Sequence, residues 1–224
     1  MESSSRTRVG ALWSRKGTPW ISGTLLLVLG ALAVYFLAGS TSPGATSDTA
    51  SVSQEYGADI RTGPEGAEVV FVEYADFECS ACALYAPKLA DLRDKYRDDV
   101  LFVFRFFPLA NHRYGVISSQ AAYAAWLQDA FWEMNDLLYE NQKEWVESDD
   151  PVPFFETYAE QLGLNMEEFR EDMVSEDTTD FITSQKEEGS AAGVNHTPFF
   201  IVNGEAIPTD DYDELEAVIA AGLR

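Results

Sequence analysis

The stretch YADFECSACALYAPKLADL (residues 74–92) contains Cys79 and Cys82, which are the only cysteines in this chain of 224 residues. Two cysteines three positions apart do not suit a disulfide framework, which staples distant segments. They also provide fewer thiolates than a structural zinc site usually has. The residues on either side of the pair therefore have to decide what its chemistry is.

The segments beside the pair predict a strand followed by a helix. AEVVFVEYADF (67–77) holds a short run of β-branched and aromatic residues, which is typical of a buried strand. After the pair, apolar side chains recur at helical spacing and are expected to share one side of a helix: Leu84, Tyr85, Leu89, Leu92 and Tyr96. VLFVFRFFPL (100–109) is a second buried strand, so the three segments predict a parallel βαβ unit.

The rest of the chain predicts several helices and then a hairpin. Helical patterns run from about residue 114 to 190, and strand patterns return at PFFIV (198–202) and EAI (205–207). The Asn-Gly pair between these two runs is a strong hairpin signal. A last helix is expected over about 211–223. The sequence thus predicts an α/β domain with a βαβ half, a ββα half and an all-helical insertion between them.

The position of the pair at the start of a helix favours redox chemistry. The positive end of the helix dipole and the free N–H groups there stabilise a thiolate at Cys79 and lower its pKa. Cys82 lies one turn later, close enough to form a disulfide with Cys79, and is expected to be more buried. Such a pair can be oxidised, can form a mixed disulfide with a substrate, and can release it by internal attack.

Several segments in order resemble thioredoxin-fold thiol-disulfide oxidoreductases, and among them the DsbA-like extracytoplasmic proteins. The resemblance covers residues 63–223 and rests on VEYADFECSAC (72–82), Pro87, FRFFPLANH (104–112), AFWEMNDLLYENQ (130–142) and GVNHTPFFIVNG (193–204). It implies a thioredoxin-like α/β fold over residues 56–224, with βαβ and ββα units around a mixed sheet. It also implies a protein thiol-disulfide oxidoreductase that needs no cofactor beyond its own redox-active disulfide.

The resemblance also implies roles for individual residues. Cys79 is the expected nucleophile and Cys82 the resolving cysteine. Glu73, six positions before the first cysteine, is the expected buried acid that relays a proton; the alternative is a strand-edge position facing water. Thr197 and Pro198 are expected to form a cis-proline loop that contacts the substrate, although an X-Pro bond is usually trans.

The two histidines have weaker claims to a role. His112 lies in the FRFFPLANH segment, where packing or a surface loop is expected rather than catalysis. His196 precedes the expected cis-proline by two positions and borders the active site if the loop forms there. With the two cysteines they make up a Cys₂His₂ set, so a copper-handling protein is an alternative function. The spacing between the four residues does not match a zinc finger.

One feature departs from the strongest oxidants of this family, which carry Pro-His between their cysteines. Here the dipeptide is Ser80-Ala81, which has neither a charge nor an aromatic ring. Glu78, directly before Cys79, adds a negative charge that opposes thiolate formation. The sequence therefore predicts a pair that is less oxidising than those of the strongest members, and a reductase or isomerase remains an alternative to an oxidase.

An uncharged segment near the N-terminus predicts a membrane anchor. No charged residue occurs from Gly17 to Ser47, and residues 20–39 have about the length of a transmembrane helix. The basic residues before it place residues 1–19 in the cytoplasm and the redox domain outside the cell membrane. Residues 40–55 are small and polar, as in a flexible tether. A cleaved signal peptide is the alternative, and both interpretations export the domain.

The charge balance excludes nucleic acid as a partner. Residues 1–38 hold four basic residues and one acidic residue, whereas the rest of the chain holds 11 basic and 37 acidic residues. A phosphate backbone requires Lys and Arg.

The leading interpretation is a membrane-tethered dithiol oxidase that acts on exported protein or peptide thiols, with a membrane redox partner that reoxidises the pair. A redox-inactive peptide-binding module is a further alternative.

Overall fold

The computed structural model describes residues 59–208 and 212–224. The expected cytoplasmic segment (1–19), membrane anchor (20–39) and tether (40–55) lie outside these residues. Within the described ranges, no helix combines the length and the apolar character that crossing a membrane requires.

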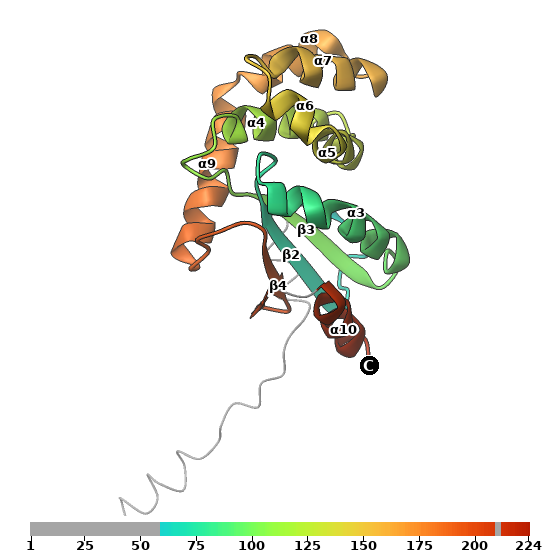
Figure 1. The fold of residues 1–224 in the computed structure, drawn as a ribbon. Helices are drawn as coiled ribbons and strands as arrows, with labels where there is room; N and C mark the ends of the chain where they lie inside the picture. The colour runs from blue at the N-terminus through green and yellow to red at the C-terminus, as the bar shows by residue number, and fades with distance from the viewer. Residues whose placement is uncertain (1–58, 209–211) are drawn as a thin grey trace, which may run out of the picture. The chain divides into compact units, whose positions relative to one another are not determined.

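A five-stranded mixed sheet forms the centre of the domain (Figure 1). Its strands are β1 (Ile60–Thr62), β2 (Val69–Ala75), β3 (Val100–Phe106), β4 (Phe199–Val202) and β5 (Glu205–Ile207). They lie in the order β1-β3-β2-β4-β5; β2 and β3 are parallel, and the other neighbouring pairs are antiparallel. This arrangement confirms the predicted βαβ and ββα halves. The short strand β1 has too few residues to show a pattern, and the sequence did not predict it.

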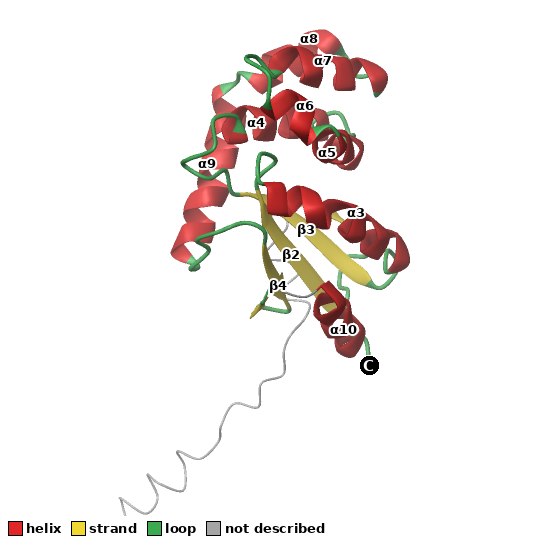
Figure 2. Cartoon of the chain, in the orientation of Figure 1, coloured by secondary structure: helices red, strands yellow, loops and turns green. Residues whose placement is uncertain are grey.

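Helices connect and cover the strands. They are α3 (Ser80–Lys95), α4 (Gly115–Trp126), α5 (Phe131–Glu140), α6 (Gln142–Val146), α7 (Val152–Gln161), α8 (Met166–Met173), α9 (Glu176–Ala191) and α10 (Tyr212–Gly222). Helices α4 to α9 follow one another without a strand between them, which confirms the helical insertion (Figure 2). The insertion runs from Gly115 of α4 to Ala191 of α9.

Helices α3 and α10 cover one face of the sheet, and α9 reaches the other (Figure 1). On the first face Leu89 and Leu92 of α3 pack with Phe71 of β2. On the opposite face Gly189, near the end of α9, lies so close to Tyr74 that a Cβ there would come within 2.7 Å of the ring. A residue larger than glycine would therefore push α9 away from the sheet.

The expected buried side of α3 was partly wrong. The helix buries Cys82, Ala86, Leu89 and Leu92, which follow a spacing of three and four residues, whereas Leu84 is 72% exposed. Because successive residues of a helix are about 100° apart, Leu84 cannot share the face that Cys82 and Ala86 occupy. The buried side of α3 is thus the side that carries Cys82, Leu89 and Leu92.

An aromatic cluster fills the space between the sheet and the helical insertion. Phe77 stacks on Phe104 with 5.5 Å between ring centroids, and its other contacts include Tyr139 at 4.9 Å. Phe131 at the start of α5 packs on Phe104 at 4.9 Å. Since Phe77 belongs to the segment between β2 and α3, this cluster anchors the residues that lead into the cysteine pair.

Candidate active site

The cysteine pair lies where β2 gives way to α3. Cys79 is the N-cap residue of α3, and its N–H donates to the Asp76 carbonyl at 3.0 Å. The Gln142 side chain of α6 donates to the carbonyls of Phe77 (2.7 Å) and Cys79 (3.0 Å). The helical insertion thus holds the loop that presents Cys79 at the positive end of the α3 dipole.

The surroundings of Cys79 favour a thiolate. Both cysteines are free, and the Cys82 thiol donates toward the Cys79 sulfur. This hydrogen bond, with the N–H groups of Cys82 and Ala81, lowers the pKa of Cys79 to about 5, although burial acts in the opposite direction. The geometry therefore provides a thiolate at neutral pH, which is the form of cysteine that attacks disulfides.

Cys82 has the opposite character. It is fully buried, and this burial raises its pKa well above the ordinary value for a thiol. The nearby Cys79 and the negative charge of Glu73 raise its pKa further. One member of the pair is thus a thiolate, while the other keeps its proton until a base removes it.

Glu73 lies in the middle of the sheet, not at a strand edge. It belongs to β2, between Phe104 of β3 and Phe200 of β4, and it is 7% exposed. It follows Val69 and Phe71 in the alternation of the strand, so its side chain faces α3. Burial raises the pKa of Glu73 to about 7, while the positive charge of Arg93 on α3 opposes the shift.

Replacing Glu73 with glutamine should increase stability at high pH. The folded-state pKa of about 7 lies above the ordinary 4.5, so the folded state holds the proton more tightly and stability is lost as pH rises from about 4.5 to 7. At pH 8 the carboxylate is ionised in both states, and its burial costs about 3 kcal/mol. We expect Glu73→Gln to raise the unfolding free energy by about 2–3 kcal/mol at pH 8 and by much less at pH 4.

Urea denaturation at several pH values measures this difference, with the exposed Glu187→Gln as the control. The unfolding free energy of each variant is compared with that of the wild-type chain at the same pH. A Glu73→Gln difference that stays constant from pH 4 to pH 8 would contradict the raised pKa.

Asp76 organises the loops around the pair. It is fully buried, and its carboxylate accepts hydrogen bonds from the N–H of Glu78 (2.8 Å), the N–H of Leu109 (2.7 Å) and Nδ1 of His112 (2.7 Å). A Cβ added at Gly115 would come within 2.9 Å of the same carboxylate. The sequence did not lead us to predict a role for Asp76. An acidic residue directly after a buried strand could have indicated one, because the loop N–H groups there need hydrogen-bond acceptors.

His112 and Glu78 form further hydrogen bonds in the loops around the pair. His112 pairs with the buried Asp76. The Glu78 carboxylate accepts from the N–H of Tyr114, which precedes α4. The Glu78 carboxylate is thus hydrogen-bonded to the first residues of the helical insertion, and it links that insertion to the active-site loop.

The loop before β4 lies against Cys79. The Thr197–Pro198 peptide bond is cis, as the resemblance implied, and the Cys79 sulfur lies 3.3 Å from the Thr197 carbonyl oxygen, to which it donates a hydrogen bond only in its thiol form. His196 is exposed, and its ring packs 5.3 Å from Phe199. In the described part of the chain, no three His, Cys, Asp or Glu side chains are grouped to hold a metal ion.

A protein-family model described as thioredoxin matches residues 55–221. The chain belongs to the thioredoxin family. The match begins before β1 and ends within α10, so it includes the helical insertion as well as the sheet. In this family member the intact pair lies at the N-terminus of α3, close after β2, which makes the chain a thiol-disulfide oxidoreductase and therefore an enzyme.

Curated relatives of this thioredoxin family member carry the name of a transporter. The chain is 38% identical over 143 residues to the Na(+)/H(+) antiporter NhaA 3 of Salinispora tropica, a match of 63% of this chain and 21% of the relative. It is 34% identical over 164 residues to the Na(+)/H(+) antiporter NhaA of Herminiimonas arsenicoxydans, covering 72% and 25% of the two chains. The matched segment thus spans about a fifth to a quarter of these relatives.

Solved structures share the fold of this thioredoxin family member. Alpha-DsbA1 of Wolbachia pipientis is 20% identical, with a TM-score of 0.62 over 74% of this chain and 89% of that one. Oxidised BdbD of Bacillus subtilis is 20% identical, with a TM-score of 0.63 over 74% and 92%. A periplasmic thioredoxin-like protein of Salmonella enterica is 24% identical, with a TM-score of 0.60 over 74% and 90%.

Proposed function

We propose that this chain is an extracytoplasmic dithiol oxidase, which forms disulfide bonds in exported proteins through Cys79 and Cys82. The observation that carries the proposal is the opposite tuning of the two thiols, with the pKa of Cys79 lowered to about 5 and that of the buried Cys82 raised. A stabilised thiolate favours the reduced form of the pair, so the disulfide readily takes electrons from substrate thiols.

The reaction starts from the oxidised pair. A substrate thiolate attacks the Cys79 sulfur, the Cys79–Cys82 bond breaks, and Cys82 leaves as a thiolate that takes up a proton. A second substrate thiolate then attacks the substrate sulfur of the mixed disulfide. This step forms the substrate disulfide and releases Cys79 as its stabilised thiolate. Two electrons have passed from the substrate to the pair, and a membrane redox partner removes them in the next half-cycle.

Glu73 and the cis-proline loop support these steps. The buried carboxyl of Glu73 faces the α3 side of the sheet and interacts electrostatically with Cys82, so it supplies the proton that Cys82 takes up. Thr197 lies against Cys79, and Pro198 has no N–H, so the loop offers backbone groups to an extended substrate peptide. Thr197 and Pro198 are the proposed substrate contacts.

The proposed location follows from the sequence. The uncharged segment 20–39 anchors the chain in the cell membrane, residues 1–19 stay in the cytoplasm, and residues 40–55 tether the redox domain (56–224) outside. Exported protein and peptide thiols are the proposed substrates. The Salmonella enterica protein that shares the fold of this domain is described as periplasmic, which is consistent with a redox domain outside the cell membrane.

The reduction potential distinguishes an oxidase from a reductase or isomerase of the same fold. The pKa of about 5 at Cys79 lies between about 7 in thioredoxin and about 3.5 in DsbA. Each unit is worth about 1.36 kcal/mol, and about 30 mV corresponds to 1.4 kcal/mol for this two-electron couple. We therefore expect a potential of about −210 to −165 mV, between about −270 mV for thioredoxin and about −120 mV for DsbA.

Equilibration of the full chain with glutathione buffers measures the potential, and Cys79→Ser and Cys82→Ser serve as controls that lack the couple. A value in the expected range supports a dithiol oxidase that is weaker than the strongest members. A value near that of thioredoxin would contradict the oxidase and leave the reductase or isomerase as the function.

A further inference from the structure

The Gln142 side chain on α6 reaches the peptide groups beside the nucleophile. Its Nε2 donates to the Phe77 carbonyl at 2.7 Å and to the Cys79 carbonyl at 3.0 Å, so one amide group serves two carbonyls of the active-site loop. The Cys79 carbonyl also accepts from the N–H of Ala83 at 3.1 Å, which is the hydrogen bond that opens α3. Gln142 therefore holds the peptide group from which α3 starts.

The core of the helical insertion fixes the position of Gln142. Three residues further along α6, Trp145 is fully buried, and its indole N–H donates to the Leu138 carbonyl of α5 at 2.8 Å. The Trp145 ring packs on Phe155 of α7, with 5.4 Å between ring centroids. Because close-packed interiors resist displacement, the five-residue helix α6 is a rigid support for the side chain that holds the loop.

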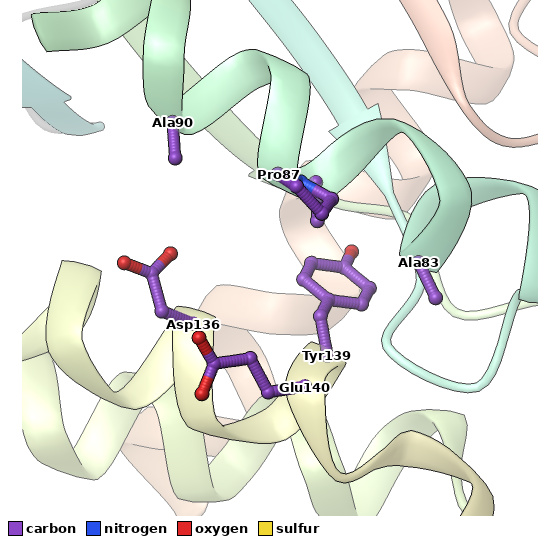
Figure 3. A pocket seen from close by; sticks show the side chains of 7 residues that line it. Ala83, Pro87, Ala90, Asp136, Tyr139 and Glu140 are labelled. Atoms are coloured by element: carbon purple, nitrogen blue, oxygen red, sulfur yellow. The ribbon is translucent and has the colours of Figure 1, made fainter.

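Packing of α5 does not fix the first turns of α3, because a cavity of about 120 Å³ lies between the two helices (Figure 3). Figure 3 shows side chains from both helices around this cavity: Ala83, Pro87 and Ala90 of α3, and Asp136, Tyr139 and Glu140 of α5. Side chains that line a cavity lack contacts on one side. The hydrogen bonds of Gln142 therefore contribute what packing between α3 and α5 does not provide at this end of the helix.

The position of the Cys79 peptide group decides where the Cys79 sulfur lies. Cys79 is the N-cap residue of α3, and its sulfur interacts with the Cys82 thiol and with the N–H groups of Ala81 and Cys82. Such hydrogen bonds weaken steeply when donor and acceptor lose their alignment. In the oxidised pair, by contrast, the covalent bond to Cys82 holds the Cys79 sulfur in place. The reduced pair therefore depends on the alignment of the loop more than the disulfide does.

We propose that Gln142 is a positioning residue that raises the reduction potential of the pair, because its hydrogen bonds to the Phe77 and Cys79 carbonyls stabilise the reduced pair more than the disulfide. Gln142 acts through the peptide group of Cys79, not on the sulfur. The inference concerns the difference in potential between two variants, so it holds for an oxidase and for a reductase alike.

Other contacts of the loop remain when Gln142 is replaced. The Cys79 N–H donates to the Asp76 carbonyl at 3.0 Å, and the Glu78 N–H donates to the Asp76 carboxylate at 2.8 Å. The Glu78 carboxylate accepts from the N–H of Tyr114. These contacts keep the loop folded, so loss of the Gln142 amide is expected to change its alignment and not its overall structure.

The substitution Gln142→Met removes the amide and keeps an unbranched side chain of the same length. In the reduced full chain, we expect the acid dissociation constant of the Cys79 thiol to fall about tenfold, which a pH titration of thiolate absorbance measures. A tenfold change corresponds to a reduction potential about 30 mV more negative for this two-electron couple. Equilibration with glutathione buffers at pH 7 measures the potential of the variant and of the wild-type chain.

Chemical denaturation of the reduced and of the oxidised chain provides an independent measurement. The substitution does not alter the couple in the unfolded chain, so the shift in potential has to equal the difference between the two losses of stability. Gln142→Met should therefore cost the reduced chain about 1.4 kcal/mol more than it costs the oxidised chain. A merely structural role would destabilise both forms equally and leave the potential unchanged.

Gln128→Met is the matched control. Gln128 is a half-buried glutamine of the same insertion, and its side-chain amide donates to the Asn165 carbonyl at 3.2 Å and accepts from the Asn165 N–H at 2.8 Å. Its replacement should destabilise the reduced and oxidised chains alike and keep the wild-type potential. Gln142→His retains one donor at the same number of bonds from the backbone, so at pH 8, where imidazole is neutral, it should shift the potential less than Gln142→Met does.

A Gln142→Met chain that loses stability but keeps the wild-type potential would overturn the inference, and an equal shift in Gln128→Met would do the same. If Gln142→Met does not fold, Gln142→His carries the comparison, and a wild-type potential in that variant together with a wild-type titration of Cys79 would overturn the inference. A wild-type chain with the potential of thioredoxin would contradict the proposed oxidase instead, so the two failures are distinguishable.

Discussion

Replacing Cys82 with serine is expected to trap a covalent adduct between Cys79 and a thiol substrate. Cys79 keeps its position at the N-terminus of α3 and its stabilised thiolate, whereas the serine hydroxyl cannot resolve a mixed disulfide. Turnover of a dithiol peptide should fall by more than about 10³-fold. Mass spectrometry after mixing with a peptide disulfide should show the mass of one peptide thiol added to the chain, and a reducing agent should remove it.

The reciprocal variant tests the assignment of roles. In Cys79→Ser the remaining thiol is fully buried and has a raised pKa, so turnover should be lost without any adduct. Adduct formation by Cys79→Ser, combined with none by Cys82→Ser, would reverse the proposed roles of the two cysteines.

Replacing Asp76 with alanine should be the most destabilising of the single changes considered for this site. Its fully buried carboxylate accepts from two loop N–H groups and from His112, and alanine would leave these three partly buried donors without their acceptor. Removing one side of a buried charged network costs about 3–5 kcal/mol. Chemical denaturation of the reduced protein measures this loss as a lower midpoint with an unchanged slope.

Asp91→Ala is the matched control, because Asp91 is exposed on α3. It should change the unfolding free energy by no more than about 0.5 kcal/mol. Asp76→Asn keeps one acceptor oxygen and should fall between the two. A loss below about 1 kcal/mol for Asp76→Ala would mean that water replaces the carboxylate and that the loops do not depend on it.

Much of the fold could be predicted from local patterns. The apolar runs that became β2 and β3, the Asn-Gly hairpin and the long helical stretch each lie within one segment, where period and turn chemistry are visible. The exposed Leu84 shows the limit of this reasoning. Periodicity indicates that a helix has an apolar side, but the packing partner decides which residues occupy it, and here Cys82 and Ala86 are buried while Leu84 is exposed.

The residues that the sequence analysis missed contact segments that are far away in the sequence. Gln142 of α6 holds the loop at Phe77 and Cys79, which precede it by more than sixty positions. Asp76 joins its own loop to Leu109 and His112. In the sequence, Tyr139 looks like any other apolar position of an amphipathic helix. Only the packing of α5 against α3 leaves its hydroxyl beside a cavity.

The sequence by itself determined the redox pair, its place between a strand and a helix, and the family resemblance, because these depend on residues that are neighbours in the chain. The tertiary structure alone decided the electrostatics. The same Cys-x-x-Cys spacing gives Cys79 a pKa of about 5 and raises that of Cys82, and β2 places Glu73 under α3 with a pKa of about 7. Burial and hydrogen bonds from distant segments set these values, and no local pattern contains them.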